Sequence, residues 1–154
     1  MSFFTDVIQR DPRAASTTAI RDLDLLEPVT RAAVLGIVAD AAVMNITLLV
    51  TETYRSKERQ AYLFSTHATQ LRDVGVHYYG LAADFCKIVE GKASWDGDWK
   101  FLGDLAKKHG LVWGGDWGAP DKPHTFCDMD HVQRCTVAQQ PELFAGAWYP
   151  ADSV

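Results

Sequence analysis

The chain has 154 residues, 47% of them hydrophobic, and a formal net charge of -5 at pH 7. This length and composition fit one compact domain over residues 1–154, large enough to enclose a core with a cleft beside it. A nucleic-acid-binding protein would carry clustered Lys and Arg on a basic surface, so the acidic balance argues against such a partner.

We expect neither a secretory signal nor a membrane span. Residues 1–6 lack a basic segment followed by an apolar one. The longest apolar stretch, residues 32–44, is interrupted by Asp40 and is too short to cross a bilayer. The sequence therefore predicts a protein that is made in the cytosol and does not insert into a membrane.

The first half of the chain predicts two helices with a strand between them. Residues 1–27 are mixed and polar, and we expect an extended or partly helical segment on the surface. Apolar residues at helical spacing predict a helix over residues 28–45, which begins at a proline. The β-branched run 46–54 predicts a buried strand. Ser56 can cap a second helix, whose apolar face consists of Ala61, Phe64, Ala68 and Leu71.

The second half predicts short strands separated by loops and one helix. In chain order these are a loop over 73–80, a strand over 81–89, a turn-rich connection over 90–98, a helix over 99–109, a strand over 111–113, a loop over 114–126 and a strand over 129–137. The chain contains no repeats, low-complexity tracts or linkers. We therefore predict a single α+β domain.

His77 and Asp84 form the first fragment of a candidate metal site. His77 lies in the loop before the predicted strand, and Asp84 lies on the strand itself. Gly80 would permit the bend that brings the imidazole to the strand face of the carboxylate. The alternative is that Asp84 pairs with a cation and His77 is an ordinary loop histidine, because one His and one Asp seven residues apart are common by chance.

The second fragment is Asp128 and His131. His131 shares a strand face with Gln133, and a turn must separate Asp128 from that strand if both are to face one metal. The same spacing occurs upstream, between Asp121 and His124. We favour His131 as the third ligand, because His124 lies in a proline-flanked loop, whereas a ligand is best held on a rigid element with a polar partner.

The two fragments together satisfy the minimum for metal-assisted hydrolysis. Catalytic zinc takes three N or O ligands and keeps a fourth position for water. His77, Asp84 and His131 supply the ligands, and Asp128 remains as a base. Arg55, at the end of the first predicted strand, can stabilise an oxyanion, with a surface ion pair as its alternative role.

The three cysteines offer a competing chemistry. Cys86, Cys127 and Cys135 are odd in number and irregularly spaced, so reduced thiols are favoured over a disulfide framework, with a Cys127–Cys135 pair as the alternative. A nucleophile made of Cys127 with His124 or His131 is the strongest rival to the metal site. It would leave the His77 and Asp84 fragment without a role.

Four segments carry a resemblance to a known family when they are taken in order. They are Tyr54-Arg55-Ser56 with Arg59-Gln60, His77-x-x-Gly80-x-Ala82-x-Asp84, Trp113-Gly114-Gly115-Asp116-Trp117 and Asp128-x-x-His131-x-Gln133. The ordered set resembles the zinc peptidases that include D-alanyl-D-alanine carboxypeptidases and phage L-alanyl-D-glutamate endopeptidases. The resemblance runs from Thr51 to Gln133, over half of the chain.

The resemblance implies a fold and a set of roles. The fold is a small α+β domain with a central antiparallel sheet flanked by helices, of the Hedgehog and DD-peptidase type. Zinc (Zn2+) is held by His77, Asp84 and His131, with Asp128 as the general base and Arg55 near the substrate carbonyl. The chain departs from the family pattern in having Gly75 for the usual Ser, Val132 for the usual aromatic residue, and a longer stretch over 117–128.

The implied function is that of a phage endolysin-like enzyme. It would hydrolyse a peptidoglycan stem-peptide bond, with the L-alanyl-D-glutamate bond as the first candidate. It would act as a monomer without a separate cell-wall-binding domain, and a holin would release it to the wall. The alternatives are a D-alanyl-D-alanine carboxypeptidase or dipeptidase, a non-catalytic metal-stabilised binding module, and a structural virion component. The presence of a base beside the ligands counts against the binding module.

Overall fold

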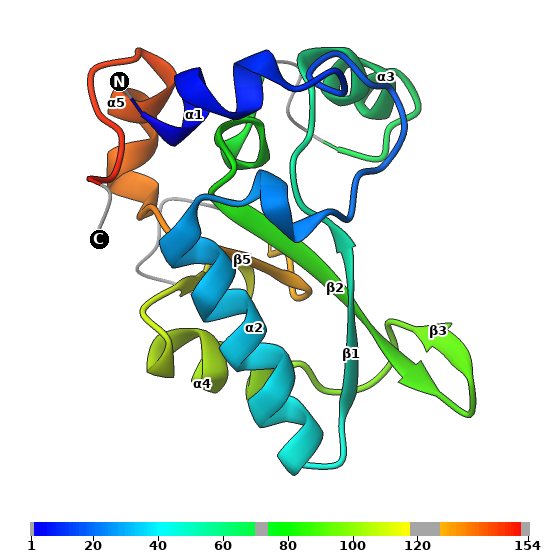
Figure 1. Ribbon diagram of the computed structural model, residues 1–154. Coiled ribbons are helices and arrows are strands. Elements are labelled where there is room, and N and C mark those ends of the chain that lie inside the picture. The colour runs from blue at the N-terminus through cyan, green and yellow to red at the C-terminus, as the bar shows by residue number, and fades with distance from the viewer. Residues whose placement is uncertain (1, 70–73, 118–126, 152–154) are drawn as a thin grey trace.

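The computed structural model describes residues 2–69, 74–117 and 127–151 as an α+β domain built around an antiparallel sheet (Figure 1). The strands are β1 (Thr47–Glu52), β2 (Ala82–Val89), β3 (Lys92–Ser94), β4 (Val112–Trp113) and β5 (His131–Gln133). The helices are α1 (Phe3–Asp6), α2 (Pro28–Val43), α3 (Lys57–Ser65), α4 (Lys100–Lys108) and α5 (Gln140–Phe144). Short 3-10 turns are η1 (Ile8–Arg10), η2 (Leu23–Leu25), η3 (Val76–Tyr79), η4 (Gly114–Asp116) and η5 (Val137–Gln139).

Strand β2 is the centre of the sheet. It pairs with β1 along one edge and with β5 and then β3 along the other, and β4 follows β5. Its first five residues include four buried apolar ones, so Asp84 is the polar exception in this stretch. The predicted α+β fold with a central antiparallel sheet is confirmed.

Alternation along the strands separates the hydrophobic core from the candidate site. Phe85 and Val132 point to the face covered by α2 and α4, where they pack with Ile37 and Leu102 in the main core. Asp84 is the neighbour of Phe85 in sequence and therefore points to the opposite face. The same reasoning places Val132 in the core and the histidine before it on the site face.

The amino-terminal segment is more buried than predicted. Ile8, Ile20 and Leu25 form a second apolar cluster with Tyr54, which follows β1. The segment is thus not only a surface segment, because its apolar residues reach the core. Their spacing is too irregular to show a period, so the sequence pattern did not predict this burial. Thr53 ties it to β1 by donating its backbone N–H to the Ile20 carbonyl at 2.7 Å.

Three other predicted elements differ in length. Helix α3 begins after the Ser56 cap as predicted but ends at Ser65, and Ala61, Phe64 and Ala68 are exposed, so the expected apolar face is wrong. Leu71 lies outside the described residues. The last predicted strand shrinks to β5 and is followed by η5 and α5, and the turn-rich connection 90–98 contains β3. In the part of the chain that the structure describes, no helix is long and apolar enough to cross a bilayer.

Candidate metal centre

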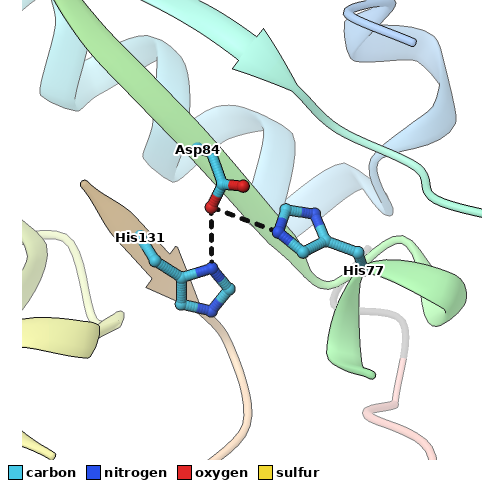
Figure 2. A group of neighbouring side chains, drawn as sticks. All are labelled: His77, Asp84 and His131. Carbon is cyan, nitrogen blue, oxygen red and sulfur yellow. Dashed lines mark hydrogen bonds and ion pairs between the residues drawn. The ribbon is translucent and has the colours of Figure 1, made fainter. Parts of the chain in front are cut away.

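His77, Asp84 and His131 converge at one point on the site face of the sheet (Figure 2). His77 comes from η3, and the other two residues are directly paired across β2 and β5. The Oδ1 atom of Asp84 lies 3.2 Å from Nε2 of His77 and 2.8 Å from Nδ1 of His131. Both histidines are buried. The structure therefore brings together the three residues that the sequence proposed as ligands.

The backbone around η3 explains how His77 reaches the site. Gly80 ends this turn with a left-handed φ of 73° and donates its N–H to the His77 carbonyl at 3.2 Å. A Cβ at Gly80 would lie 2.5 Å from Cδ1 of Ile8 and 2.8 Å from the Leu25 carbonyl oxygen. Gly80 thus serves both the left-handed turn and the close approach of the amino-terminal segment.

The hydrogen bonds of His77 leave Nε2 free to bind a metal. Its Nδ1 lies 2.7 Å from the Thr53 carbonyl oxygen, which can only accept, so Nδ1 carries the proton. Nε2 then holds a lone pair, and this buried atom has no hydrogen-bond partner among the described residues. A lone pair that faces a carboxylate oxygen requires a cation or a proton between them.

The hydrogen bonds of His131 select the other tautomer, in which Nε2 carries the proton. The side-chain amide of Gln133 donates from Nε2 to the Cys135 carbonyl at 2.8 Å, which orients its Oε1 toward the imidazole. Nε2 of His131 lies 2.9 Å from that Oε1 and must donate to it. Nδ1 therefore faces Asp84 with a lone pair whenever His131 is neutral. We infer that His131 would bind a metal through Nδ1 and His77 through Nε2.

The three ligand atoms fit a zinc ion by their chemistry and spacing. Bonds of about 2.0–2.1 Å place neighbouring ligand atoms of a tetrahedral zinc site about 3.3 Å apart. The two measured separations from Oδ1 of Asp84, 3.2 Å and 2.8 Å, are close to this value, and all three ligand atoms lie within 4.8 Å of one another. Two imidazoles and one carboxylate leave a fourth position for water.

The electrostatics of the cluster favour positive charge at the same point. Burial alone would raise the pKa of Asp84, but the charge of His77 and the hydrogen bond with His131 hold it well below its ordinary value. Burial alone would lower the pKa of His131, but the adjacent Asp84 carboxylate raises it. The buried carboxylate therefore attracts a cation or a proton to the point where both imidazoles meet it.

Asp128 lies beside the cluster, in the turn that leads into β5. The His131 N–H donates to the Asp128 carbonyl at 3.4 Å, so a turn separates the two residues as predicted. One carboxylate oxygen of Asp128 lies within 4.8 Å of the Asp84 carboxylate. Gly114 holds this turn by accepting the Asp128 N–H at 3.0 Å, and a Cβ at Gly114 would lie only 2.2 Å from the Asp128 carbonyl oxygen.

Asp130 is a third carboxylate at the site, which the sequence reasoning missed. It groups with Asp84 and Asp128 within 4.8 Å. Burial, a hydrogen bond with Asp128 and the charge of Asp84 raise the pKa of Asp130 to about 8. Asp130 therefore holds its proton more tightly than an ordinary carboxyl group. The D-x-D spacing before His131 is the sequence signal that could have found it.

Arg55 is a buried member of the site and not part of a surface ion pair. Its Nη2 lies 2.6 Å from Glu52 and 3.3 Å from Oδ2 of Asp84, and its side chain is 14% exposed. Nε donates to Glu52 at 3.2 Å and Nη1 donates to Gln60 at 3.2 Å. Four of its five N–H groups thus have acceptors among the described residues.

Two comparisons of the sequence decide the family. A family model described as D-alanyl-D-alanine carboxypeptidase matches residues 64–126. The peptidoglycan L-alanyl-D-glutamate endopeptidase CwlK of Bacillus subtilis strain 168 is 30% identical over 132 residues, which cover 71% of this chain and 79% of CwlK.

The chain belongs to the D-alanyl-D-alanine carboxypeptidase family of peptidases. The L-alanyl-D-glutamate peptidase of a Listeria phage is 37% identical over 86 residues, which cover 52% of this chain and 30% of the phage protein. Members of this family are metallopeptidases, and the clustered His and Asp side chains form a possible metal-binding group. The family resemblance predicted from the ordered motifs is confirmed.

Solved structures share the fold of this family member. The L-Ala D-Glu endopeptidase ChiX of Serratia marcescens superposes with a TM-score of 0.56 at 19% identity, over 77% of this chain and 90% of ChiX. An L,D-carboxypeptidase DacB of Streptococcus pneumoniae gives a TM-score of 0.54 at 17% identity, over 80% of this chain and 73% of DacB. At these identities the likeness shows the fold alone.

The choice between His124 and His131 depends on geometry. The matched family segment contains His124 and ends before His131. His124 lies outside the described residues. His131 faces Asp84 from a strand and has a polar partner in Gln133, the conditions on which the sequence prediction was based.

The cysteine alternative finds no support among the described residues. All three thiols are free, with Cys127 exposed and the other two buried, so the Cys127–Cys135 pair is not formed. Both ring nitrogens of His131 are already engaged, by Asp84 and by Gln133. No ring nitrogen of His131 therefore remains to activate the Cys127 thiol. The other partner proposed for that thiol, His124, lies outside the described residues.

Proposed function

We propose that this family member is a zinc-dependent peptidase that hydrolyses a peptidoglycan stem-peptide bond, with the L-alanyl-D-glutamate bond as its first candidate. The observation that carries the proposal is the convergence of two imidazole lone pairs on Oδ1 of Asp84. CwlK, which is named for that bond, matches most of the chain and supports the choice of substrate.

In this proposal the ligands are His77, Asp84 and His131. When bound, zinc lowers the pKa of a coordinated water to about 7 and polarises the scissile carbonyl. Asp128 is the general base, because its carboxylate lies beside the ligands without being needed as one of them. It accepts a proton from the attacking water and delivers it to the departing amine. The one N–H of Arg55 that has no acceptor among the described residues is the donor that we assign to the developing oxyanion.

The family description favours a second candidate, a D-alanyl-D-alanine carboxypeptidase or dipeptidase. Both activities use the same metal centre and differ in the bond presented to it. A non-catalytic metal-stabilised module would keep the ligands but would not need Asp128 beside them, and a virion component would cause no chelator-sensitive lysis. We retain the endopeptidase, because the relative that covers more of the chain carries that name.

The cellular setting belongs to the same proposal. The match to a phage peptidase supports an endolysin that a holin releases to the wall. We further propose that the protein acts as a monomer and does not insert into the membrane. Adding the 154-residue chain from outside to cells and to purified sacculi tests whether it acts on the cell wall.

Mass spectrometry of muropeptides tests the function directly. Intact sacculi are digested with the protein, with and without a chelator, beside a short peptide that ends in D-Ala-D-Ala. New amino-terminal D-glutamate on sacculi, lost with chelator and restored by zinc, is expected. Release of D-alanine from the short peptide alone would transfer the assignment to the carboxypeptidase, and no chelator-sensitive product from either substrate would refute both.

A further inference from the structure

A β-bulge places two carboxylates directly opposite each other beside the metal centre. The β1–β2 register shifts between Val50 and Glu52, which makes Thr51 the extra residue. Without the bulge Thr51 would face Asp84, but with it Glu52 is the cross-strand partner of Asp84. Like charges in this arrangement repel, so the pair needs a cation between its members.

Arg55 supplies that cation and joins the two carboxylates. Oε1 of Glu52 accepts from Nη2 of Arg55 at 2.6 Å and from Nε at 3.2 Å. The same Nη2 donates to Oδ2 of Asp84 at 3.3 Å. Asp84 thus divides its oxygens, with Oδ2 toward the guanidinium and Oδ1 toward both imidazoles.

The network is buried and its charges are balanced. Glu52 is 5% exposed, and its second oxygen accepts from Nε of Arg59. Burial alone would raise the pKa of Glu52, but the hydrogen bond and charge of Arg55 outweigh it, so the pKa lies below its ordinary value. Glu52 therefore stays ionised between two guanidinium groups.

We propose that Glu52 is a positioning residue: it fixes Arg55, and Arg55 turns Oδ1 of Asp84 toward the two histidines. Among the described residues, Glu52 belongs to neither group of side chains that could share a metal ion, and its link to Asp84 passes through the guanidinium. The inference rests on the proposed zinc site but not on the identity of the bond that is cleaved. Residues that orient metal ligands typically change metal affinity by about 10- to 100-fold.

Zinc affinity of the purified full chain, measured by competition with a chromogenic chelator, tests the proposal without a substrate. Glu52→Gln is expected to weaken zinc binding by about tenfold or more. Arg59→Gln is the matched control, because it removes the other cation of Glu52 and leaves the bridge through Arg55 intact. It should bind zinc as tightly as the unmodified chain.

A double-mutant cycle separates positioning from a general loss of structure. In an Arg55→Met background, Glu52→Gln should cause no further loss of zinc affinity, because the route from Glu52 to Asp84 is already broken. Additive losses in the double variant would overturn the proposal, as would unchanged zinc affinity in Glu52→Gln alone. If Glu52→Gln does not fold, Glu52→Asp carries the same test, because it keeps the charge and withdraws the carboxylate by one methylene.

The outcomes also separate this inference from the proposed function. Weaker zinc binding in Glu52→Gln by a chain that cleaves no peptidoglycan would support the positioning role and reject the peptidase. Cleavage of sacculi by the unmodified chain, together with native zinc affinity in Glu52→Gln, would support the peptidase and reject the positioning role.

Discussion

The substitution Gly114→Ala tests whether the turn that carries Asp128 is positioned by close backbone packing. The added Cβ would lie 2.2 Å from the Asp128 carbonyl oxygen and 3.2 Å from the Asp128 Cβ. Carbon and carbonyl oxygen normally approach to about 3.3 Å, so the two segments must separate by about 1 Å. Both contacting groups are backbone or Cβ atoms, which no rotamer change can move away.

A displacement of about 1 Å in a reacting group can cost about 100-fold in rate, so we expect turnover on a stem-peptide substrate to fall by about that factor. His77 and Asp84 lie on other elements, and His131 is held in the sheet by β2, so bound zinc should remain. The assay is steady-state turnover together with metal content and thermal midpoint.

Gly91→Ala is the control for a general loss of stability. No atom of the described residues lies within 4 Å of its added Cβ, but its φ of +76° strains any side chain by about 1–2 kcal/mol. It should therefore lower the thermal midpoint and leave turnover unchanged. Turnover of Gly114→Ala within about threefold of the unmodified enzyme would refute the reasoning, since the predicted loss of turnover is about 100-fold. Loss of its zinc would also refute it, since only the proposed base, Asp128, is expected to move.

Three further predictions concern the site. His131→Ala should lose bound zinc whereas His124→Ala should keep it, and metal analysis with the opposite result would reverse the choice of third ligand. Asp128→Asn should abolish turnover with zinc still bound, whereas activity that survives in Asp128→Asn and is lost in Asp130→Asn would identify Asp130 as the base. The folded pKa of Glu52 is depressed, so its stabilisation is complete above the ordinary value of 4.5 and is lost as pH falls through the lower folded pKa. Denaturant unfolding below pH 4.5 should therefore depend less on pH in Glu52→Gln, and equal slopes would contradict this.

Local patterns predicted much of the scaffold because they depend on neighbouring residues. The proline start of α2, the Ser56 cap of α3 and the apolar run of β2 each produce the element that was expected. The face of α3 was wrong, since exposure of Phe64 depends on what the rest of the chain places beside that helix. Element type was thus more predictable than burial.

The sequence by itself determined which chemical groups are available and on which side of each strand they lie. The order of His77, Asp84, Asp128 and His131, with Gly80 at the left-handed turn, was sufficient to predict a metal site. These features follow from side-chain period and backbone sterics, which act over a few residues.

Only the tertiary structure decided how these groups are oriented. The Thr53 carbonyl that selects the His77 tautomer is a backbone group and leaves no trace in residue identity. The bulge at Thr51, which aligns Glu52 with Asp84, is set by the register between strands whose paired residues are 32 to 41 positions apart in the sequence. Register and tautomer depend on packing between distant segments, so local sequence patterns do not contain them.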